Sequence, residues 1–363
     1  MAELLQRCSP AAVIAALLAG KPLPWPAAMP APERARQRWT ARLGEAPTAD
    51  KLDAWQRKGI RFVCPGDPEW PGQLDLLGPA RPWGVWLRGN ADLRFACLRS
   101  VSIVGTRAAT AYGQHVCGEM AAALAEREWA VVSGGAYGID SRAHQGALAA
   151  EGVTVAVLPG GVDHPYPRGH HDLFQAIAAG GVLVSELPPG RTPTRPGFLV
   201  RNRLIAALSR GTVVVEAALR SGALNTARHA RDLNRPLMAV PGPVTSALSE
   251  GCHEIIREAG AVCVTCAGDV IEMLAFPGEH GPAGAGGPAS PGGPVLPRDA
   301  LDPVTARVLE VIPARQGRGP ARIAVTAGVD FDTAMRCLGE LTAGGFVERC
   351  ERGWRLRPPA RRG

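Results

Sequence analysis

The sequence lacks an apolar run long enough to span a bilayer, and it lacks a disulfide framework. The apolar stretch at residues 11–20 is too short for a transmembrane helix, and basic residues barely precede it. Nine cysteines, an odd number, are scattered through 363 residues. The lone CxxC pair, Cys263 and Cys266, has no second pair at zinc spacing and lies in an apolar run, which favours buried thiols over a metal or redox site. We therefore expect a soluble cytoplasmic protein without membrane segments.

Lysine is also scarce. Only 3 of the 40 basic residues are lysines, and the formal net charge is +7. This bias fits a GC-rich genome, but it also supplies forked guanidinium donors that suit phosphate. Basicity alone indicates an acidic partner without identifying it.

A segment rich in glycine and proline divides the chain. Of the 18 residues at 277–294, 12 are glycine or proline, so no packed element is possible there. We predict four parts: a helical N-terminal region at 1–60, a core at 61–276, a linker at 277–300 and a small domain at 301–363.

Short apolar strands alternate with helical patterns through the core. Continuous valine and isoleucine runs separated by helices are typical of an α/β fold with a doubly wound, mainly parallel sheet, here an extended Rossmann-like one. Residues 61–96 are expected to be an irregular lead-in. The strand candidates are 101–104, 130–133, 154–158, 182–185, 212–216, 237–240 and 261–264, and helices are expected at 113–128, 141–150 and 223–232.

The C-terminal part predicts a winged-helix-like domain. Helices are expected at 304–311, 323–327 and 333–343, followed by a two-stranded wing turning at 352–353. Residues 303–363 hold 11 arginines and 6 acidic residues, a net charge of +5. The last helix has only Arg336 as a basic residue, so the domain suits protein partners as readily as DNA.

The arginines at 201 and 203 are expected to lie at the start of a helix that leads into the strand at 212–216. A helix N-terminus disfavours cations, and a bound anion between the arginines and the free backbone N–H groups would reverse this. The alternative is that both arginines pair with nearby carboxylates.

Three further strand ends carry small or basic residues. Parallel strands meet at one edge of the sheet, where glycines admit a phosphate and arginines clamp it. None of these segments matches the dinucleotide fingerprint or the phosphate loop. The predicted binding residues are Gly105, Thr106, Arg107, Ser133, Gly134, Gly135, Arg168, Arg201, Asn202 and Arg203, and the aromatic residues available for base stacking are Phe198, Tyr166 and Tyr137. Each aromatic residue fits core or loop packing equally well.

No catalytic or metal constellation is evident. Asp140 is expected to be the N-cap of the helix at 141–150, and His144 to be a packed or hydrogen-bonded histidine. The histidines at 164, 170 and 171 lie in a loop without an ordered scaffold, so we predict neither a metal nor a cofactor.

An ordered set of motifs resembles one bacterial family. The motifs are IVGTR at 103–107, SGGAYGIDSRAH at 133–144, SELPPG at 185–190, RNR at 201–203, VVEA at 214–217, SGALNTA at 221–227 and AVPG at 239–242, with PGDPEWPGQL at 65–74 before them. Together they resemble the DNA-processing protein A family (DprA, also called Smf) over about residues 60–274.

The resemblance implies a non-enzymatic protein that binds single-stranded DNA, protects incoming strands in natural transformation and helps load the RecA recombinase. It also implies a homodimer, a sterile-alpha-motif-like N-terminal domain, here shortened, and a C-terminal winged helix. Three positions depart from the family pattern: His170 and His253 replace asparagines, and Leu199 replaces a proline.

The alternative function is that of a Rossmann-like phosphoribohydrolase acting on nucleotides. Members of that group resemble one another in a motif in which a Gly-Thr pair and a glutamate follow Pro-Gly-Gly. Here Pro-Gly-Gly at 159–161 continues as Val-Asp-His-Pro, without that glutamate, which weakens this alternative.

Overall fold

The computed structural model describes residues 7–275 and 301–357 together with Leu4, apart from positions 26, 28, 30, 45, 315 and 316. The chain divides into two compact units, residues 1–282 and 283–363, and each is described by itself. The predicted linker at 277–300 lies outside the described residues.

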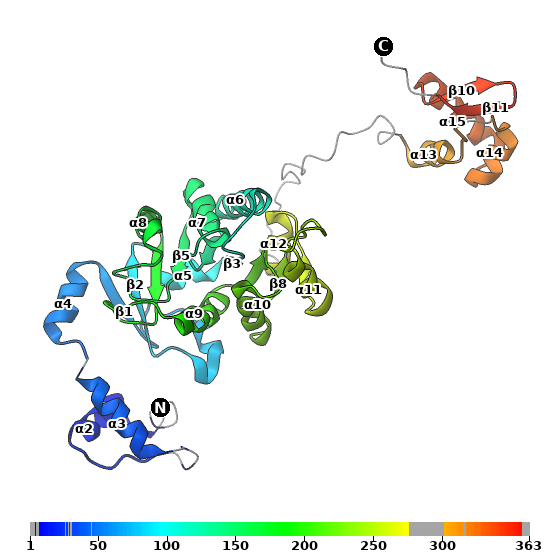
Figure 1. The fold of residues 1–363 in the computed structure, drawn as a ribbon. Coiled ribbons are helices and arrows are strands. Elements are labelled where there is room, and N and C mark those ends of the chain that lie inside the picture. The colour runs from blue at the N-terminus through cyan, green and yellow to red at the C-terminus, as the bar shows by residue number, and fades with distance from the viewer. Residues whose placement is uncertain are drawn as a thin grey trace. The chain divides into compact units, whose positions relative to one another are not determined.

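The larger unit is built on a nine-stranded sheet with the order β1-β2-β6-β5-β4-β3-β7-β8-β9 (Figure 1). Seven of these strands run parallel to one another, and they correspond to the seven predicted from the apolar runs. The doubly wound, mainly parallel sheet is therefore confirmed. The parallel strands are β3 (Ser100–Val104), β4 (Ala130–Ser133), β5 (Thr154–Val157), β6 (Val182–Ser185), β7 (Gly211–Val214), β8 (Leu237–Ala239) and β9 (Val262–Cys263).

The expectation of an irregular lead-in is wrong, because two strands of that region extend the sheet. β1 (Ile60–Val63) pairs antiparallel with β2 (Val85–Gly89), and β2 pairs antiparallel with β6. A short 3-10 segment, η1 (Gly72–Ala80), lies between them. Sequence periodicity missed these strands because they are short and separated by proline- and glycine-rich chain.

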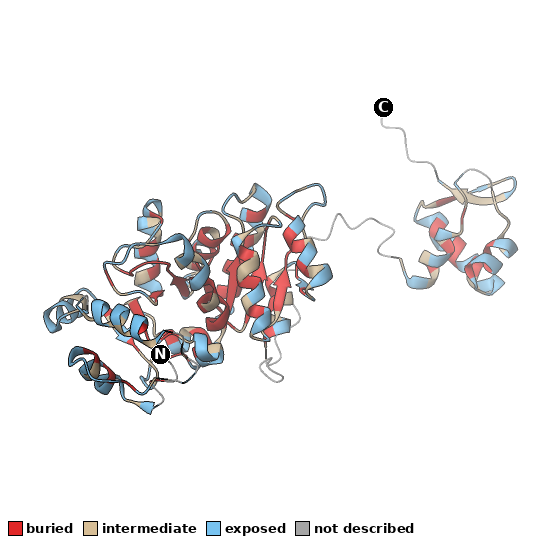
Figure 2. Cartoon of the chain, turned by 60° about the horizontal axis from the view of Figure 1, so that its bottom comes forward, coloured by how far each residue is buried: buried red, intermediate tan, exposed pale blue. Residues whose placement is uncertain are grey.

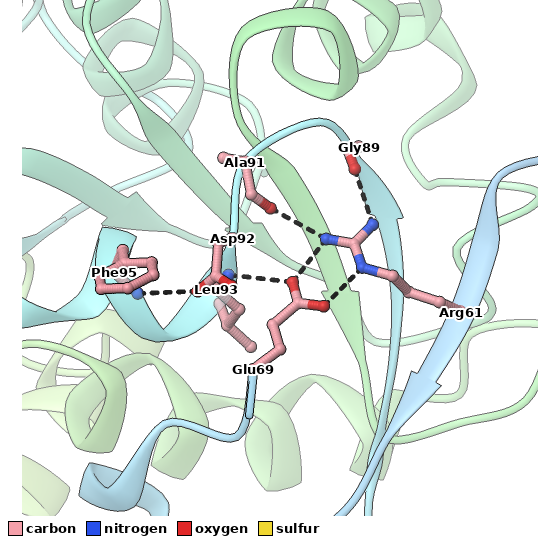
Figure 3. A network of polar contacts seen from close by, with 7 residues as sticks. All are labelled: Arg61, Glu69, Gly89, Ala91, Asp92, Leu93 and Phe95. Atoms are coloured by element: carbon pink, nitrogen blue, oxygen red, sulfur yellow. Dashed lines mark hydrogen bonds and ion pairs between the residues drawn. The ribbon is translucent and has the colours of Figure 1, made fainter. Parts of the chain in front are cut away.

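A polar network fastens this extension to the sheet (Figure 3). Arg61 on β1 pairs with both carboxylate oxygens of Glu69 at 2.7 and 2.6 Å, and it also donates to the carbonyl oxygens of Gly89 and Ala91. Glu69 in turn accepts a hydrogen bond from the backbone N–H of Leu93 at 3.0 Å, where the helix α5 (Leu93–Leu98) begins. The network thus holds β1, β2 and α5 in one arrangement.

Helices cover both faces of the sheet. One layer comprises α5, α9 (Arg195–Leu208), α10 (Gly222–Asp232) and α11 (Glu250–Glu258), which share a core with inward residues of β4, β5, β6 and β7. The other comprises α6 (Ala111–Ala125), α7 (Ile139–Ala149) and α12 (Ala267–Leu274), and α8 (His171–Gly180) packs near β5 and β6. Figure 2 shows buried strands between helices whose outer faces are exposed.

The N-terminal region is helical, as predicted, with α2 (Pro10–Leu18), α3 (Pro32–Leu43) and α4 (Ala49–Arg57). A small core of Leu4, Val13, Leu17 and Leu23, with Trp39 and Leu43 of α3 packed against it, holds α2 and α3 together. The Trp55 ring on α4 packs edge-on against Trp86 of β2 at 5.2 Å.

The smaller unit contains all the elements predicted for a winged-helix-like domain. These are α13 (Pro303–Glu310), α14 (Pro320–Ala327), α15 (Phe331–Ala343) and the antiparallel pair β10 (Val347–Cys350) and β11 (Gly353–Leu356). Arg336 on α15 pairs with Glu340 at 2.8 Å, so the one basic side chain of that helix is partly neutralised.

Candidate nucleic-acid interface

A pocket lies at the switch point of the sheet. From β3 the chain adds β4, β5 and β6 on one side. It then returns to the other side of β3, where β7 begins the second half of the parallel sheet. Ligands of open α/β sheets bind beyond the carboxyl ends of the strands at such a point. A pocket of about 190 Å³ is found here, lined by residues of the loops after β3 and β4 and of α9 and α10, among them Gly105, Arg107, Ala136, Asp140, Phe198, Arg201, Asn202 and Thr226.

The loop after β3 is held by Glu216, which follows β7. The Thr106 N–H donates to the carbonyl oxygen of Glu216 at 2.7 Å. The Glu216 carboxylate, on a residue only 2% exposed, accepts hydrogen bonds from the N–H and the hydroxyl of Thr110 at 2.9 and 2.6 Å. Glu216 therefore positions the loop that carries Arg107. Glu216 belongs to the VVEA motif at 214–217, but no sequence pattern indicates this role.

The loop after β4 lies beside the loop after β3. The Ser133 hydroxyl donates to the carbonyl oxygen of Ile103 at 2.6 Å, which links the two strand ends. Gly138 has φ of +80°, and a Cβ there would lie 2.3 Å from the Thr106 carbonyl oxygen, so only glycine allows the two loops to approach this closely. Gly135 and Tyr137 belong to the same turn.

The predicted helix start at Arg201 is wrong. Helix α9 begins at Arg195, capped by the Thr194 hydroxyl, which accepts from the Gly197 N–H at 3.2 Å, and Pro196 lies in its first turn. Arg201 therefore lies well inside the helix, where the unpaired N–H groups of a helix N-terminus are absent. The helix dipole therefore does not require an anion beside Arg201.

Arg201 instead fills the base of the pocket. It is 6% exposed, and its Nη1 donates to the carbonyl oxygens of Gly134, at 2.6 Å, and of Val157, so it bridges the ends of β4 and β5. A Cβ on Gly134 would lie 2.3 Å from Nη1, so this glycine makes room for the guanidinium. Burial lowers the pKa of Arg201 to about 10, and its Nε is buried without a hydrogen-bond partner.

Asp140 is buried beside Arg201 and is not the N-cap of its helix. That position belongs to Gly138, and Asp140 lies in the first turn of α7. Burial raises the pKa of the Asp140 carboxyl group, while the charge of Arg201 and the N–H groups of Ala136 and Gly105 act in the opposite direction. The base of the pocket thus combines a buried cation with a buried acid.

Asn202 and Arg203 have mainly structural contacts. The Asn202 amide donates to the Gly222 carbonyl oxygen at 3.3 Å and to Asn225 at 3.1 Å, which fixes the start of α10. Arg203 pairs with both carboxylate oxygens of Glu186 at 2.8 and 2.7 Å. For Arg203, carboxylate pairing, the alternative weighed from the sequence, is the arrangement observed.

Arg107 and Phe198 lie at the mouth of the pocket, and Tyr166 packs against Phe198. The exposed Arg107 places its guanidinium carbon 5.1 Å from the ring centre of Phe198, and both residues line the pocket. The Tyr166 ring meets Phe198 edge-on at 5.8 Å and is 46% exposed. Arg107, Phe198 and Tyr166 together form what we call the rim cluster.

Arg168 and Tyr137 lie on the neighbouring loops. Arg168 is exposed at the start of the 3-10 turn η2 (Arg168–His170). The Tyr137 ring, 50% exposed, meets His170 at 4.5 Å, and the His170 Nδ1 lies 3.1 Å from the Gly135 carbonyl oxygen. His170, at a departure from the family pattern, thus joins the two loops.

His253 and His144 each have a specific contact, whereas nothing in the structure explains the departure at Leu199. The His253 Nε2 lies 3.0 Å from the Gly242 carbonyl oxygen, and Leu199 is 53% exposed on α9. His144 is fully buried, and its Nδ1 lies 2.7 Å from the Thr154 hydroxyl, as expected of a hydrogen-bonded core histidine. Burial and the charge of Arg201 lower its pKa to about 3.

The CxxC pair differs from the sequence expectation. Cys263 is exposed on β9 and Cys266 is half-buried at the start of α12, so neither thiol is buried. Within the described ranges, no group of three or more histidine, cysteine, aspartate or glutamate side chains is placed to hold a metal ion. In the same ranges, no helix has the length and hydropathy needed to cross a membrane.

These features define a doubly wound, Rossmann-like α/β protein with arginine and aromatic side chains at the mouth of its switch-point pocket. A family model described as DNA recombination-mediator protein A matches residues 61–275, and the chain belongs to this family.

Named relatives agree with this assignment. The chain is 47% identical over 321 residues, 85% of its length and 80% of the relative's, to a Mycobacterium tuberculosis protein named as the DNA processing protein DprA. A solved structure of DprA from Streptococcus pneumoniae superposes with a TM-score of 0.59 at 34% identity, covering 67% of this chain and 83% of that one. A solved structure of DNA processing protein A from Helicobacter pylori is described as showing a unique single-stranded DNA binding mode. It superposes with a TM-score of 0.53 at 30% identity, covering 59% of this chain and 95% of that one.

Proposed function

We propose that the chain binds single-stranded DNA at the carboxyl edge of its sheet, without catalysing a reaction. Phosphates bind Arg107 and Arg168, and bases stack on Phe198, Tyr166 and Tyr137. The observation that carries this proposal is the rim cluster, an exposed arginine stacked on an aromatic ring at the mouth of the switch-point pocket. Arginine with aromatic residues is the combination that holds single strands, whose bases are free to stack.

The base of the pocket also indicates that the exposed arginines, and not the buried one, bind phosphate. Asp140 is buried there with its carboxyl group next to the space that a ligand would enter. Arg201 is also buried there and already donates to two carbonyl oxygens, so the exposed arginines are the side chains that a phosphate can reach. Arg201, Asn202 and Arg203 act on binding indirectly, by fixing α9 and the strand ends that carry the rim cluster.

The relatives support the class of ligand. The Helicobacter pylori protein is described as binding single-stranded DNA, and this chain shares its fold at 30% identity. We further propose the roles that the resemblance implies: protection of incoming strands, help in loading RecA, action as a homodimer, and residence in the cytoplasm.

The first prediction concerns the form of DNA and its salt dependence. Affinity should be higher for single strands than for duplex of the same length, and the logarithm of the affinity should fall with the logarithm of salt by about 0.7 per phosphate neutralised. Fluorescence anisotropy of labelled oligonucleotides across a salt series measures both. Equal affinity for duplex, or release of free base from nucleoside monophosphates with steady turnover, would overturn the proposal.

The second prediction concerns the C-terminal unit. All the proposed contact residues precede residue 276, so a chain ending there should keep most of the affinity for single strands. The comparison is between the full chain and the truncated chain on one oligonucleotide. If the truncated chain folds but binds hundreds of times more weakly, the C-terminal unit is the principal binder.

A further inference from the structure

A second groove adjoins the switch-point pocket. It is an open groove of about 590 Å³ between the chain before β2 and the outer face of α9. The Leu199 side chain lines both spaces, so the groove lies next to the pocket, on the other side of this residue. The exposed side chains of Trp83, Leu199 and Val200 give it an apolar surface.

Trp83 is displayed by a fixed stretch of chain. Its neighbours Pro82 and Gly84 are buried, whereas the Trp83 side chain is 53% exposed. A Cβ on Gly84 would lie 2.2 Å from the Phe62 ring, so the backbone is packed directly beneath that ring. A large aromatic ring presented to solvent on a fixed backbone needs little ordering when a flat ligand stacks on it.

Arginine contacts tie this stretch to α9. The Arg203 Nε donates to the Ala80 carbonyl oxygen at 3.0 Å, and the Arg81 Nη1 pairs with Asp75 at 2.8 Å. Because Arg203 also pairs with Glu186, both arginines that line the groove already have carboxylate partners. The groove therefore has little free positive charge to offer a phosphate, and it suits an uncharged flat group.

We propose that Trp83 is a stacking platform for a base of the same single strand that occupies the switch-point pocket. The proposal rests on the proposed function. A strand held by Arg107 and Phe198 at the pocket mouth crosses Leu199 and enters the groove, where a base stacks on the indole ring. Every base has a π face, so this contact adds affinity without sequence preference.

The test compares short and long oligothymidylates, of about five and about twenty nucleotides, with the full chain. Trp83→Ala should weaken binding of the long strand about tenfold, because one base–aromatic stack contributes on that order. It should leave binding of the short strand unchanged, because the short strand occupies the pocket alone. Trp83→Phe, which keeps an aromatic ring, should restore most of the loss.

The control is Phe95→Ala. Phe95 is 68% exposed on α5, at the opposite, amino edge of the sheet, and its loss should change neither affinity. The inference fails if Trp83→Ala binds the long strand like the unmodified chain, or if it weakens both strands equally. It also fails, together with the proposed function, if the unmodified chain does not prefer single strands. If Arg107 and Arg168 matter for the long strand and Trp83 does not, only the inference fails.

Discussion

Replacing both exposed arginines, Arg107→Ala and Arg168→Ala, should lower the affinity for single-stranded DNA by about two orders of magnitude or more. Hydrogen bonds to charged groups contribute roughly 1.5–3 kcal/mol each, and both side chains offer forked donors to a phosphate. The melting temperature of the DNA-free protein should stay unchanged, because both residues are exposed and surface substitutions rarely alter stability by more than about 0.5 kcal/mol. Titration with a labelled oligonucleotide and a thermal melt measure the two quantities.

A matched control separates specific contacts from overall charge. Arg94 on α5 and Arg127 after α6 are also exposed, but they precede their strands and so lie at the amino edge of the sheet. Arg94→Ala with Arg127→Ala removes the same charge and should cost far less affinity. If both double variants bind equally weakly, the attraction is a property of the net charge of +7, and the carboxyl edge is not the site.

The parallel half of the sheet could be predicted because its strands are buried on both faces. Runs such as 130–133 and 182–185 are apolar throughout, and the structure places strands at those positions. The two antiparallel strands gave a weaker signal. β1 has a mixed pattern in which Arg61 and Phe62 reach the surface, and its pairing with β2 is held by the Arg61–Glu69 network, which no local pattern reveals.

The convergence of the strand ends could also be predicted, since parallel strands share a carboxyl edge. Gly105, Arg107, Phe198 and Arg201 line one pocket in the structure. The function of each side chain could not be predicted, because it depends on whether the side chain is buried at the base of the pocket or exposed at its mouth. Arg107 and Arg201 are the same residue type on adjacent segments, yet one is exposed and the other is buried against two carbonyl oxygens.

The helix start shows why local rules were insufficient. Thr194 followed by Pro196 is a regular start signal for a helix, but the prediction placed the helix start near Arg201, whereas the first helical residue is Arg195. With that later start, Arg201 and Arg203 were assigned to the N-terminus of the helix, although both lie in its interior. Trp83 was missed for a related reason: in a stretch expected to be irregular, nothing in the sequence shows that its two neighbours are buried.

Replacing Arg201 by methionine should destabilise the protein by several kcal/mol, about 3–5, even without DNA. Methionine keeps much of the apolar volume, but it leaves Asp140 buried without its nearby cation and the Gly134 and Val157 carbonyl oxygens without their donor. Removing one partner of a buried charge is far more costly than removing a surface charge. Arg195→Met, an exposed arginine in the first turn of the same helix, is the matched control and should have little effect.

The stability deficit should depend on pH in a defined direction. Burial raises the folded-state pKa of Asp140 above its unfolded value, and Arg201 and Arg107 oppose that rise, so losing Arg201 raises the pKa further. A carboxyl group with a raised folded pKa favours the folded state when protonated, and that contribution is lost as pH increases through the folded pKa. Chemical denaturation should therefore show a larger deficit for Arg201→Met at pH 8 than at pH 5. Adding Asp140→Asn should remove this pH dependence, and a deficit that is small at both pH values would show that Arg201 does not hold the strand ends together.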